Sequence, residues 1–457
     1  MDTTYWFLAG AALLGLYMAW NIGANDVANS MADAVGSRSI SIRNAVIAAG
    51  ICEFLGAVLV GSSVTDTIRK GIIKPDVVAA YVATGRESTR GPAPAVEPGA
   101  DPAPSATPPG EMTEAAKKLA LGMTCALFSA AIWLHASSYL GMPVSTTHSI
   151  VGAVSGMGIV AFGHLAIDWW VMAKIVVSWF ISPVAGGLMA FLLFKLIIRT
   201  ILGRAQPSRA ALHFAPLLVF LVAFVMCLGT LHKGLKHLIK EAGPELQWMS
   251  DHAIWISIGA GLVAMIAARF YLARKLRGDY RLSLGDQLER VEMALAPIVV
   301  LTSCCVAFSH GANDVANSVG PLAAVVDIVN SGEIPEKVPV PFWVLCLGGI
   351  GIVAGLAMYG YRVMRTVGSR ITQLTPSRGI AADLSATAVV LLCSRLQLPV
   401  STTHTLVGAI LGVGLARGLS SVNRTVTRNI FGGWLLTVPA AAGVAMVLYT
   451  IAALCFL

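Results

Sequence analysis

The stretch GANDVANS occupies residues 23–30, and the same eight letters return at residues 311–318. Each copy holds two asparagines and an aspartate, yet each lies within a long apolar run of the chain. An ionisable side chain in such surroundings is costly and is usually functional. The repetition of the octet therefore predicts two copies of one structural unit, each with a polar centre.

The composition around these copies is that of a membrane protein. The chain has 457 residues, of which 56% are hydrophobic and 12% are charged, and its mean hydropathy is +0.74. Soluble domains carry about 25% charged residues. Apolar runs of about 20 residues, enough to cross a bilayer as a helix, recur along the chain. We predict an all-α polytopic membrane protein with about twelve membrane segments, near 5–33, 43–66, 114–138, 144–163, 168–198, 214–231, 253–272, 293–322, 341–363, 379–397, 400–416 and 430–457.

Charge and cysteine content argue against several other classes of protein. The net charge is +8, but the Lys and Arg residues lie in short loops between apolar runs, so no nucleic-acid partner is expected. The eight cysteines lack metal-ligand spacing and are expected to be buried hydrophobic residues. No P-loop indicates ATP hydrolysis, and no nucleophile with its base is visible, so an enzyme is not expected.

A second motif repeats in the same order as the first. The sequence PVSTTH occupies residues 143–148 and returns at 399–404, each time after a GANDVANS copy. The ordered motifs divide the chain into a first repeat at 1–200, middle segments with a connecting loop at 201–292, and a second repeat at 293–457.

Basic residues orient the segments, because cytoplasmic loops carry the excess of Lys and Arg. The loops assigned to the cytoplasm are 34–43, 195–209, 269–290, 362–378 and 417–428. The loop 327–340 and the Pro-, Ala- and Gly-rich stretch 85–112, which is expected to be flexible, face outside together with both termini. The segments at 114–163 then leave and return on the outer side, and those at 379–416 on the inner side, as re-entrant hairpins or as full crossings. Such inverted repeats are typical of secondary transporters, whose sites lie between the repeats.

The polar centre of GANDVANS suits a hard cation. In a helix, two asparagines four residues apart share a face, and the aspartate lies beside them. Carboxylate and amide oxygens are the ligands that such cations favour. The candidate ligands of a coupling cation, with sodium preferred to the proton, are Asn25, Asp26, Asn29, Asn313, Asp314 and Asn317. Gly23 and Gly311 permit either close helix packing or a helix break. The alternative is that the asparagines only join helices.

PVSTTH has the composition of a helix start, because proline suits the first turn and Ser or Thr caps it. Helix N-termini bind anions through free N–H groups and the positive end of the dipole. Two starts that enter from opposite faces could converge on one tetrahedral oxyanion, and ordinary capping without a ligand is the alternative. A nearby carboxylate favours phosphate over sulfate, because it accepts the proton that phosphate keeps at neutral pH. The candidate anion-binding residues are Ser145, Thr146, Thr147, Ser401, Thr402, Thr403, Asp26 and Asp314.

Four further ionisable residues are candidates for coupling or gating. His148 and His404 end the two PVSTTH motifs, where each either bonds to the backbone or relays a proton. Glu53 lies in the middle of an apolar segment, where a carboxyl group is expensive. Asp383 lies early in another apolar segment, where the membrane interface could solvate it instead.

These motifs, together with GSSVTDTIRKGI at 61–72 and VGSRITQLTPSRG at 367–379, closely resemble the inorganic phosphate transporter family of the PiT type. The resemblance implies a secondary phosphate symporter coupled to sodium or protons, built as an inverted repeat with hairpins around a central phosphate site. It also implies a homodimer. The short central loop is similar to that of prokaryotic members, which implies the cell membrane, in a prokaryote the inner membrane.

The same resemblance implies roles for particular residues. The residues of the ion and phosphate sites would be Asn25, Asp26, Asn313, Asp314 and the two STT stretches. Glu53 matches an acid that is important in the family. Asp383 stands where relatives have glutamate, so its role is open.

We therefore expect import of inorganic phosphate by symport and alternating access, with no cofactor. A permease for sulfate or another oxyanion with the same fold is the main alternative. An anion channel would lack ion coupling, and a receptor would need a folded soluble domain, which the sequence does not show. A membrane-embedded enzyme would need an acid–base or metal constellation, against which the symmetric pairing of the motifs argues.

Overall fold

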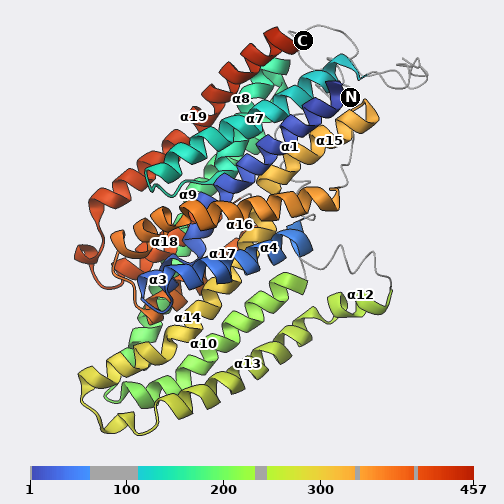
Figure 1. Cartoon of the computed structure of the whole chain (residues 1–457). Coiled ribbons are helices and arrows are strands. Elements are labelled where there is room, and N and C mark those ends of the chain that lie inside the picture. The colour runs from blue at the N-terminus through green and yellow to red at the C-terminus, as the bar shows by residue number, and fades with distance from the viewer. Residues whose placement is uncertain (1–2, 62–111, 232–243, 335–339, 396–399) are drawn as a thin grey trace.

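The computed structural model describes residues 3–61, 112–231, 244–334, 340–395 and 400–457, and the regular elements in these ranges are helices (Figure 1). The first part of the chain forms α1 (Thr3–Ile22), the π-helical turn η1 (Gly23–Val27), α2 (Ala28–Ser30), α3 (Ala32–Gly36), α4 (Ile42–Val60), α7 (Glu114–Tyr139), α8 (Thr146–Phe162), α9 (Trp169–Ile197) and η4 (Ile198–Leu202). The remainder forms α10 (Pro207–Gly229), α12 (Pro244–Asp251), α13 (Ala253–Lys275), α14 (Leu284–Asp314), α15 (Ala316–Ser331), α16 (Phe342–Arg365), η7 (Thr366–Arg370), α17 (Pro376–Arg395), α18 (Thr402–Leu415) and α19 (Arg424–Phe456).

Ten stretches of the described chain are long and apolar enough to cross a membrane. Two further apolar helices are shorter, since α8 has 17 residues and α18 has 14. At a rise of 1.5 Å per residue they reach about 26 and 21 Å, less than the roughly 30 Å of a bilayer core. The prediction of an all-helical membrane protein is confirmed, and the ten long stretches and two short helices together fall on the predicted apolar segments.

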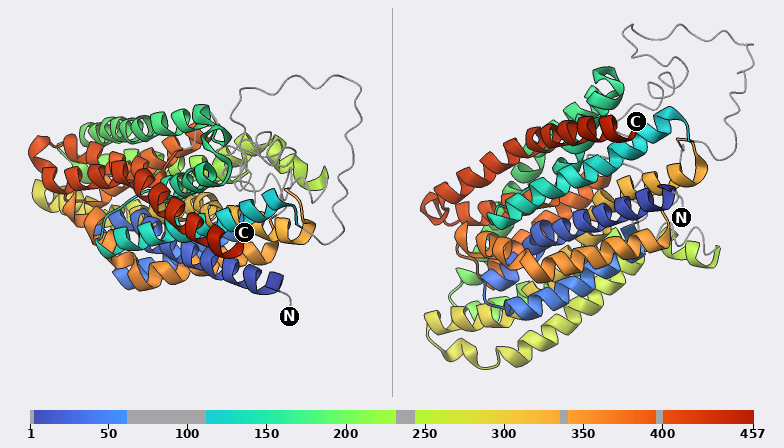
Figure 2. Two further views of the ribbon diagram at one scale, coloured as in Figure 1. Left: turned by 90° about the horizontal axis from the view of Figure 1, so that it is seen from above. Right: turned by 45° about the horizontal axis from the view of Figure 1, so that its top comes forward.

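The two short helices are the second arms of hairpins that begin at opposite ends of the molecule. The hairpin α7–α8 starts where the Thr113 amide donates to the Gly332 carbonyl after α15 (3.1 Å), at the end where both termini lie (Figure 1 and Figure 2). The hairpin α17–α18 starts and returns at the other end, where Thr372 Oγ1 donates to the Ser421 carbonyl (2.8 Å). The buried tips of the two hairpins therefore approach each other from opposite sides.

Glycines let the helices that carry the motifs cross within carbonyl contact. A Cβ added to Gly23 would lie 1.8 Å from the Ile352 carbonyl oxygen of α16, and one added to Gly311 would lie 2.3 Å from the Glu53 carbonyl oxygen of α4. Only glycine permits such an approach. The helices do not break, because the first copy continues through η1 and the second through one irregular residue, Val315. Of the two roles predicted for these glycines, the structure shows close packing.

The helices extend further into the polar stretches than predicted. In place of a loop at 269–290, α13 and α14 leave only residues 276–283 between them. The helical backbone of α16 and η7 likewise continues into the predicted loop 362–378. Arg, Lys and Glu are good helix formers, so a helix continues past its apolar span into water. Hydropathy detects only the apolar part of such a helix.

Some of the predicted features lie outside the described residues. They are the stretch 85–112 except Met112, residues 62–72 of the motif that starts at Gly61, and Pro399 of the second PVSTTH.

The crossing of α1 and α16 can be tested with two alanine substitutions. We expect Gly23→Ala to lower the free energy of unfolding by about 1–3 kcal/mol, because the added methyl group meets backbone atoms that cannot move aside. Gly10→Ala is the matched control, since nothing lies within 4 Å of its Cβ position, and it should be neutral or stabilising by up to about 1 kcal/mol. The measurement is thermal unfolding of the purified variants in detergent. Equal melting temperatures would contradict the close crossing.

Candidate functional site

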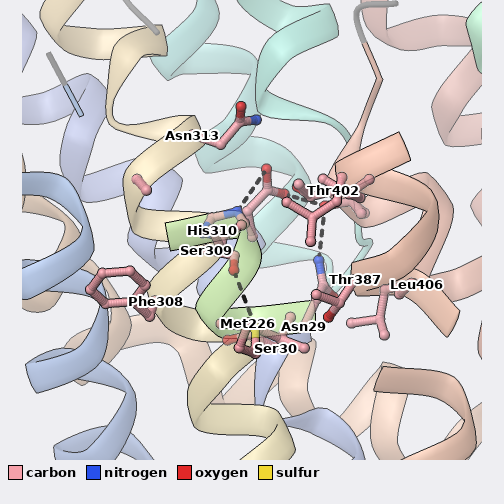
Figure 3. Close-up of a pocket in the computed structure, with 18 of the residues that line it drawn as sticks. Asn29, Ser30, Met226, Phe308, Ser309, His310, Asn313, Thr387, Thr402 and Leu406 are labelled. Atoms are coloured by element: carbon pink, nitrogen blue, oxygen red, sulfur yellow. Dashed lines mark hydrogen bonds and ion pairs between the residues drawn. The ribbon is translucent and has the colours of Figure 1, made fainter. Parts of the chain in front are cut away.

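A cavity of about 80 Å³ lies where the two GANDVANS copies face the second hairpin (Figure 3). Its polar lining consists of Asp26, Asn29, Ser30, Thr230, Ser309, His310, Asn313, Thr387, Thr402 and Thr403. Its apolar lining comes mainly from α10, α14 and α17, and includes Met226, Gly229, Phe308, Val390 and Leu391. A small number of convergent polar groups in an apolar cavity is the usual form of a ligand site.

The Asp26 carboxylate joins the tips of both hairpins. It is 2% exposed and accepts hydrogen bonds from Thr146 Oγ1 of α8 (2.6 Å) and from Thr403 Oγ1 of α18 (2.7 Å). The Thr146 amide, at the first residue of α8, also donates to it (3.4 Å). One acid of the first repeat is therefore bound by hydroxyl groups that come from both halves of the chain.

The second asparagine of each GANDVANS copy crosses to the hairpin of the other repeat. Asn29 Nδ2 donates to Thr403 Oγ1 (3.1 Å), and Asn317 Nδ2 donates to Thr146 Oγ1 (3.1 Å) and Thr147 Oγ1 (3.2 Å). Asn29 Oδ1 is buried and has no hydrogen-bond partner in the described part of the chain. That oxygen is thus free to ligate a cation.

Asp314 occupies the equivalent place in the second half-site. Its carboxylate accepts hydrogen bonds from Thr402 Oγ1 (2.9 Å) and from Asn313 Nδ2 (2.8 Å), and His310 Nε2 lies 2.5 Å from it. The pairing of Thr402 with Asp314 matches the pairing of Thr146 with Asp26. The sequence repeat therefore has a structural counterpart in its acid–threonine pairs.

His310 lies between the carboxylates of the site and was not among the predicted residues. Its Nδ1 lies 3.1 and 3.2 Å from the two oxygens of Glu53, and its Nε2 lies 3.8 Å from Asp26 in addition to its contact with Asp314. Asp26, His310 and Asp314 offer ligand atoms within 4.8 Å of one another, which could hold a metal ion. The first copy has Ile22 at the corresponding position, so the motif search did not include it. An ionisable residue in an apolar segment was the signal that could have identified His310.

The PVSTTH motifs begin helices, as predicted. The helices α8 and α18 start at Thr146 and Thr402, and the Ser145 and Ser401 hydroxyls accept from the backbone N–H three residues further on (3.2 Å each). Both serines therefore cap their helices. The threonines that follow point their hydroxyls at the aspartates, so the positive helix ends face negative charge. An arrangement of this kind can bind a small oxyanion.

Asn25 does not share the surroundings of Asn29, contrary to the prediction that both lie on one face. Its Nδ2 donates to the Met142 carbonyl (3.0 Å) and to Ser138 Oγ (3.1 Å), and its Oδ1 accepts from the Val144 amide (3.0 Å). The cause is η1, because a π-helical turn changes the angle between residues four apart. In this structure Asn25 holds the turn of the first hairpin, and it does not line the cavity.

Known proteins resemble this chain over nearly its whole length. The model of the phosphate transporter family matches residues 22–445. The chain belongs to the phosphate transporter family. It is 42% identical to a predicted phosphate permease of Pyrococcus abyssi over 99% of both chains, and 39% identical to the chloroplastic inorganic phosphate transporter 2-1 of Arabidopsis thaliana over 96% of this chain and 70% of that one. A solved structure titled "The sodium-dependent phosphate transporter" matches with a TM-score of 0.81 and 39% identity, covering 98% of this chain and 99% of that one.

Membership of the phosphate transporter family makes the chain a multi-pass membrane transporter and not an enzyme. The remaining predicted residues differ in whether they contact the central site. Glu53 reaches the central site through His310. His148 and His404 lie behind the helix starts, in ring contact with each other at 4.6 Å, and do not line the cavity.

Asp383 forms a second acidic cluster away from the central cavity. Ser303 Oγ donates both to Asp383 (3.0 Å) and to Asp33 (3.2 Å), and Thr302 Oγ1 donates to Asp383 (2.6 Å). Both aspartates are fully buried, so Asp383 is not solvated at an interface. Asp33 was not predicted, although it follows the first GANDVANS by only three residues inside a predicted segment.

The role of Asn25 can be tested against a neighbouring asparagine. Asn25→Leu would leave the Met142 carbonyl and the Val144 amide without partners, at a cost of about 1–3 kcal/mol each. Asn21→Leu is the control, because among the described residues the Asn21 side chain donates only within its own helix, to the Tyr17 carbonyl (2.8 Å). We expect a clear fall in melting temperature for the first variant and a small change for the second. A stable Asn25→Leu protein would contradict the hairpin role.

Proposed function

We propose that the chain imports inorganic phosphate by symport with sodium. The observation that supports this most directly is the Asp26 carboxylate, bound by threonines from both hairpins. A site that needs both hairpins assembled can bind its ligand only when the two halves of the protein are correctly placed. That dependence is what alternating access around a central site requires.

The helix starts supply the phosphate ligands in this proposal. The proposed ligands are Ser145, Thr146, Thr147, Ser401, Thr402 and Thr403, with backbone N–H groups at the starts of their helices. Asp26 and Asp314 would accept the proton of bound phosphate. Sulfate has no proton to offer at neutral pH, so the same carboxylates would repel it. The two serines would act mainly as caps that hold the threonines in place.

Oxygen atoms beside these helix starts are suited to sodium. The proposed cation ligands are Asp26, Asn29, Asn313, Asp314 and Asn317, and among them Asn29 Oδ1 is already without a partner. The solved relative, which is 39% identical, is a sodium-dependent phosphate transporter. Asn25 would not bind the cation itself but would hold the turn of the first hairpin in place.

A proton is the second candidate for the coupling ion. The contact of His310 with Glu53 favours it, because an imidazole between carboxyl groups can pass a proton. Uptake of labelled phosphate into liposomes under an imposed sodium or proton gradient would separate the two. Asp383 and Asp33 lie away from this contact, as a separate pair of buried acids. The proposal includes a coupling or gating role for this pair, independent of His310.

The proposal includes an inverted repeat of about twelve segments. Residues 1–200 and 293–457 would form the two repeats, and 201–292 would form middle segments that add a wall to the site. The opposite entry of the hairpins supports the inversion. The transporter would work as a homodimer in the cell membrane, with both termini outside.

The two aspartates can be tested by charge removal. Asp26→Asn and Asp314→Asn should each lower sodium-driven phosphate uptake by at least about tenfold, because a buried cation loses a partner worth several kcal/mol. Asp286→Asn, at the exposed start of α14, is the control and should transport normally. The measurement is uptake against sodium concentration in liposomes. Wild-type sodium dependence in both site variants would contradict the assignment.

The proposed orientation can be tested by cysteine labelling. In a background without reactive native cysteines, Ser39→Cys should react with an impermeant thiol reagent only from the cytoplasmic side, and Gly332→Cys only from outside. Ser39 follows α3 and Gly332 follows α15, at opposite ends of the structure (Figure 1). Labelling of both cysteines from the same side would contradict their placement on opposite sides of the membrane. Labelling of Ser39→Cys from outside and of Gly332→Cys from the cytoplasm would contradict only the proposed orientation.

A further inference from the structure

Four aromatic rings are packed together behind the two threonine-bearing helix starts. His148 of α8 lies 4.6 Å from Trp179 of α9, and His404 of α18 is stacked on Trp434 of α19 at 3.7 Å between ring centroids. The two histidine rings also meet edge to face at 4.6 Å. Both histidines and Trp434 are at most 5% exposed. These four residues are called the ring cluster below.

The ring cluster crosses between the two hairpins. The helix α8 packs on α19, where Cβ atoms added to Gly152 and Gly156 would lie within 2.6 Å of α19 carbonyl oxygens. The helix α18 packs in the same way on α9 through Gly408 and Gly412. Yet the histidine of each hairpin contacts the tryptophan of the helix that supports the other hairpin, His148 with its ring tilted and His404 with its ring stacked. The cluster therefore joins two tightly packed helix pairs.

Trp434 contacts the tips of both hairpins directly. Its Nε1 donates to the Pro143 carbonyl (3.0 Å), three residues before α8 begins at Thr146. Its ring face is stacked on His404, two residues after α18 begins at Thr402. One rigid indole thus touches the chain next to both helix starts.

In the described part of the chain, the ring nitrogens of the two histidines form no hydrogen bond or ion pair with the aspartates of the site, Asp26 and Asp314. His148 Nδ1 and both ring nitrogens of His404 are buried without a hydrogen-bond partner in the described chain. What both histidines contribute is ring surface.

We propose that the ring cluster is a positioning device, which holds the two helix starts at the separation that lets one phosphate ion contact both hairpins. His148, His404, Trp179 and Trp434 are its positioning residues. The inference rests on the proposed function, in which the threonines at the helix starts bind phosphate. It assigns the histidines of PVSTTH to packing and not to proton transfer.

Histidine substitutions separate packing from proton transfer. His404→Phe keeps an aromatic ring against Trp434 and should leave the KM for phosphate within about twofold of wild type. His404→Ala removes the ring and should raise KM about 2- to 10-fold, the effect expected of one aromatic pair. The measurement is uptake by the full chain in liposomes, with KM and Vmax determined separately. Loss of Vmax in both variants with unchanged KM would overturn the proposal, because a proton carrier is not rescued by phenylalanine.

A tryptophan pair provides the matched control. Trp434→Phe keeps the stacking but loses the bond to Pro143, and should raise the KM for phosphate about 3- to 10-fold. Trp133→Phe loses a comparable bond to Thr437 of the same helix (3.2 Å), away from the hairpin tips, and should leave KM unchanged. Thermal unfolding of both variants shows whether the fold is retained.

The outcomes distinguish this inference from the function on which it rests. If wild type transports phosphate and Trp434→Phe has the KM of Trp133→Phe, the positioning role is overturned and the transport function stands. If wild type takes up no phosphate under any gradient, both fail. A rise in KM confined to Trp434→Phe and His404→Ala, with little change in Vmax, supports the positioning role.

Discussion

The buried carboxylate of Asp26 is the constraint on which the rest of the site depends. A negative charge away from water is tolerated only where hydrogen bonds or opposite charges compensate it. Two threonine hydroxyls supply that compensation, and they come from hairpins that begin at opposite ends of the molecule. The tips of both hairpins must therefore converge on one residue. The tight glycine crossings follow from this convergence, because they bring the motif helices close enough for the contact.

The structure has a symmetric part and an asymmetric part, which have different physical origins. The acid–threonine and asparagine–threonine pairs occur in both halves because the motifs that form them are repeated. Glu53 and His310 have no such counterparts. The carbonyl that approaches Gly311 belongs to Glu53, whereas the one that approaches Gly23 belongs to Ile352. The two half-sites therefore share their acid–threonine and asparagine–threonine pairs but differ in their other ionisable residues.

The sequence predicted what depends on composition and repetition, and failed where geometry decides. Hydropathy identified the apolar helices, and the helix starts at Thr146 and Thr402 followed from proline and the hydroxyl residues. The direction of Asn25 could not be predicted, because the π-helical turn that rotates it leaves no mark in the spacing. His310 and Asp33 were missed because they lie just outside the repeated octets. The histidine–tryptophan contacts could not be predicted either, because they depend on how the helix pairs cross, and the sequence alone does not specify that crossing.

The charges of the proposed phosphate site explain why phosphate would need coupled cations to bind there. Three carboxyl groups, those of Asp26, Glu53 and Asp314, lie close to one imidazole. Two like charges about 4 Å apart repel by about 4 kcal/mol even at an effective dielectric constant of about 20. Phosphate bound as we propose would bring further negative charge into the same low-dielectric volume, so it would bind there only together with cations or protons that neutralise the acids. Coupling then follows from the electrostatics of the site, since the anion and its counter-ions stabilise one another in the bound state and neither is bound well alone.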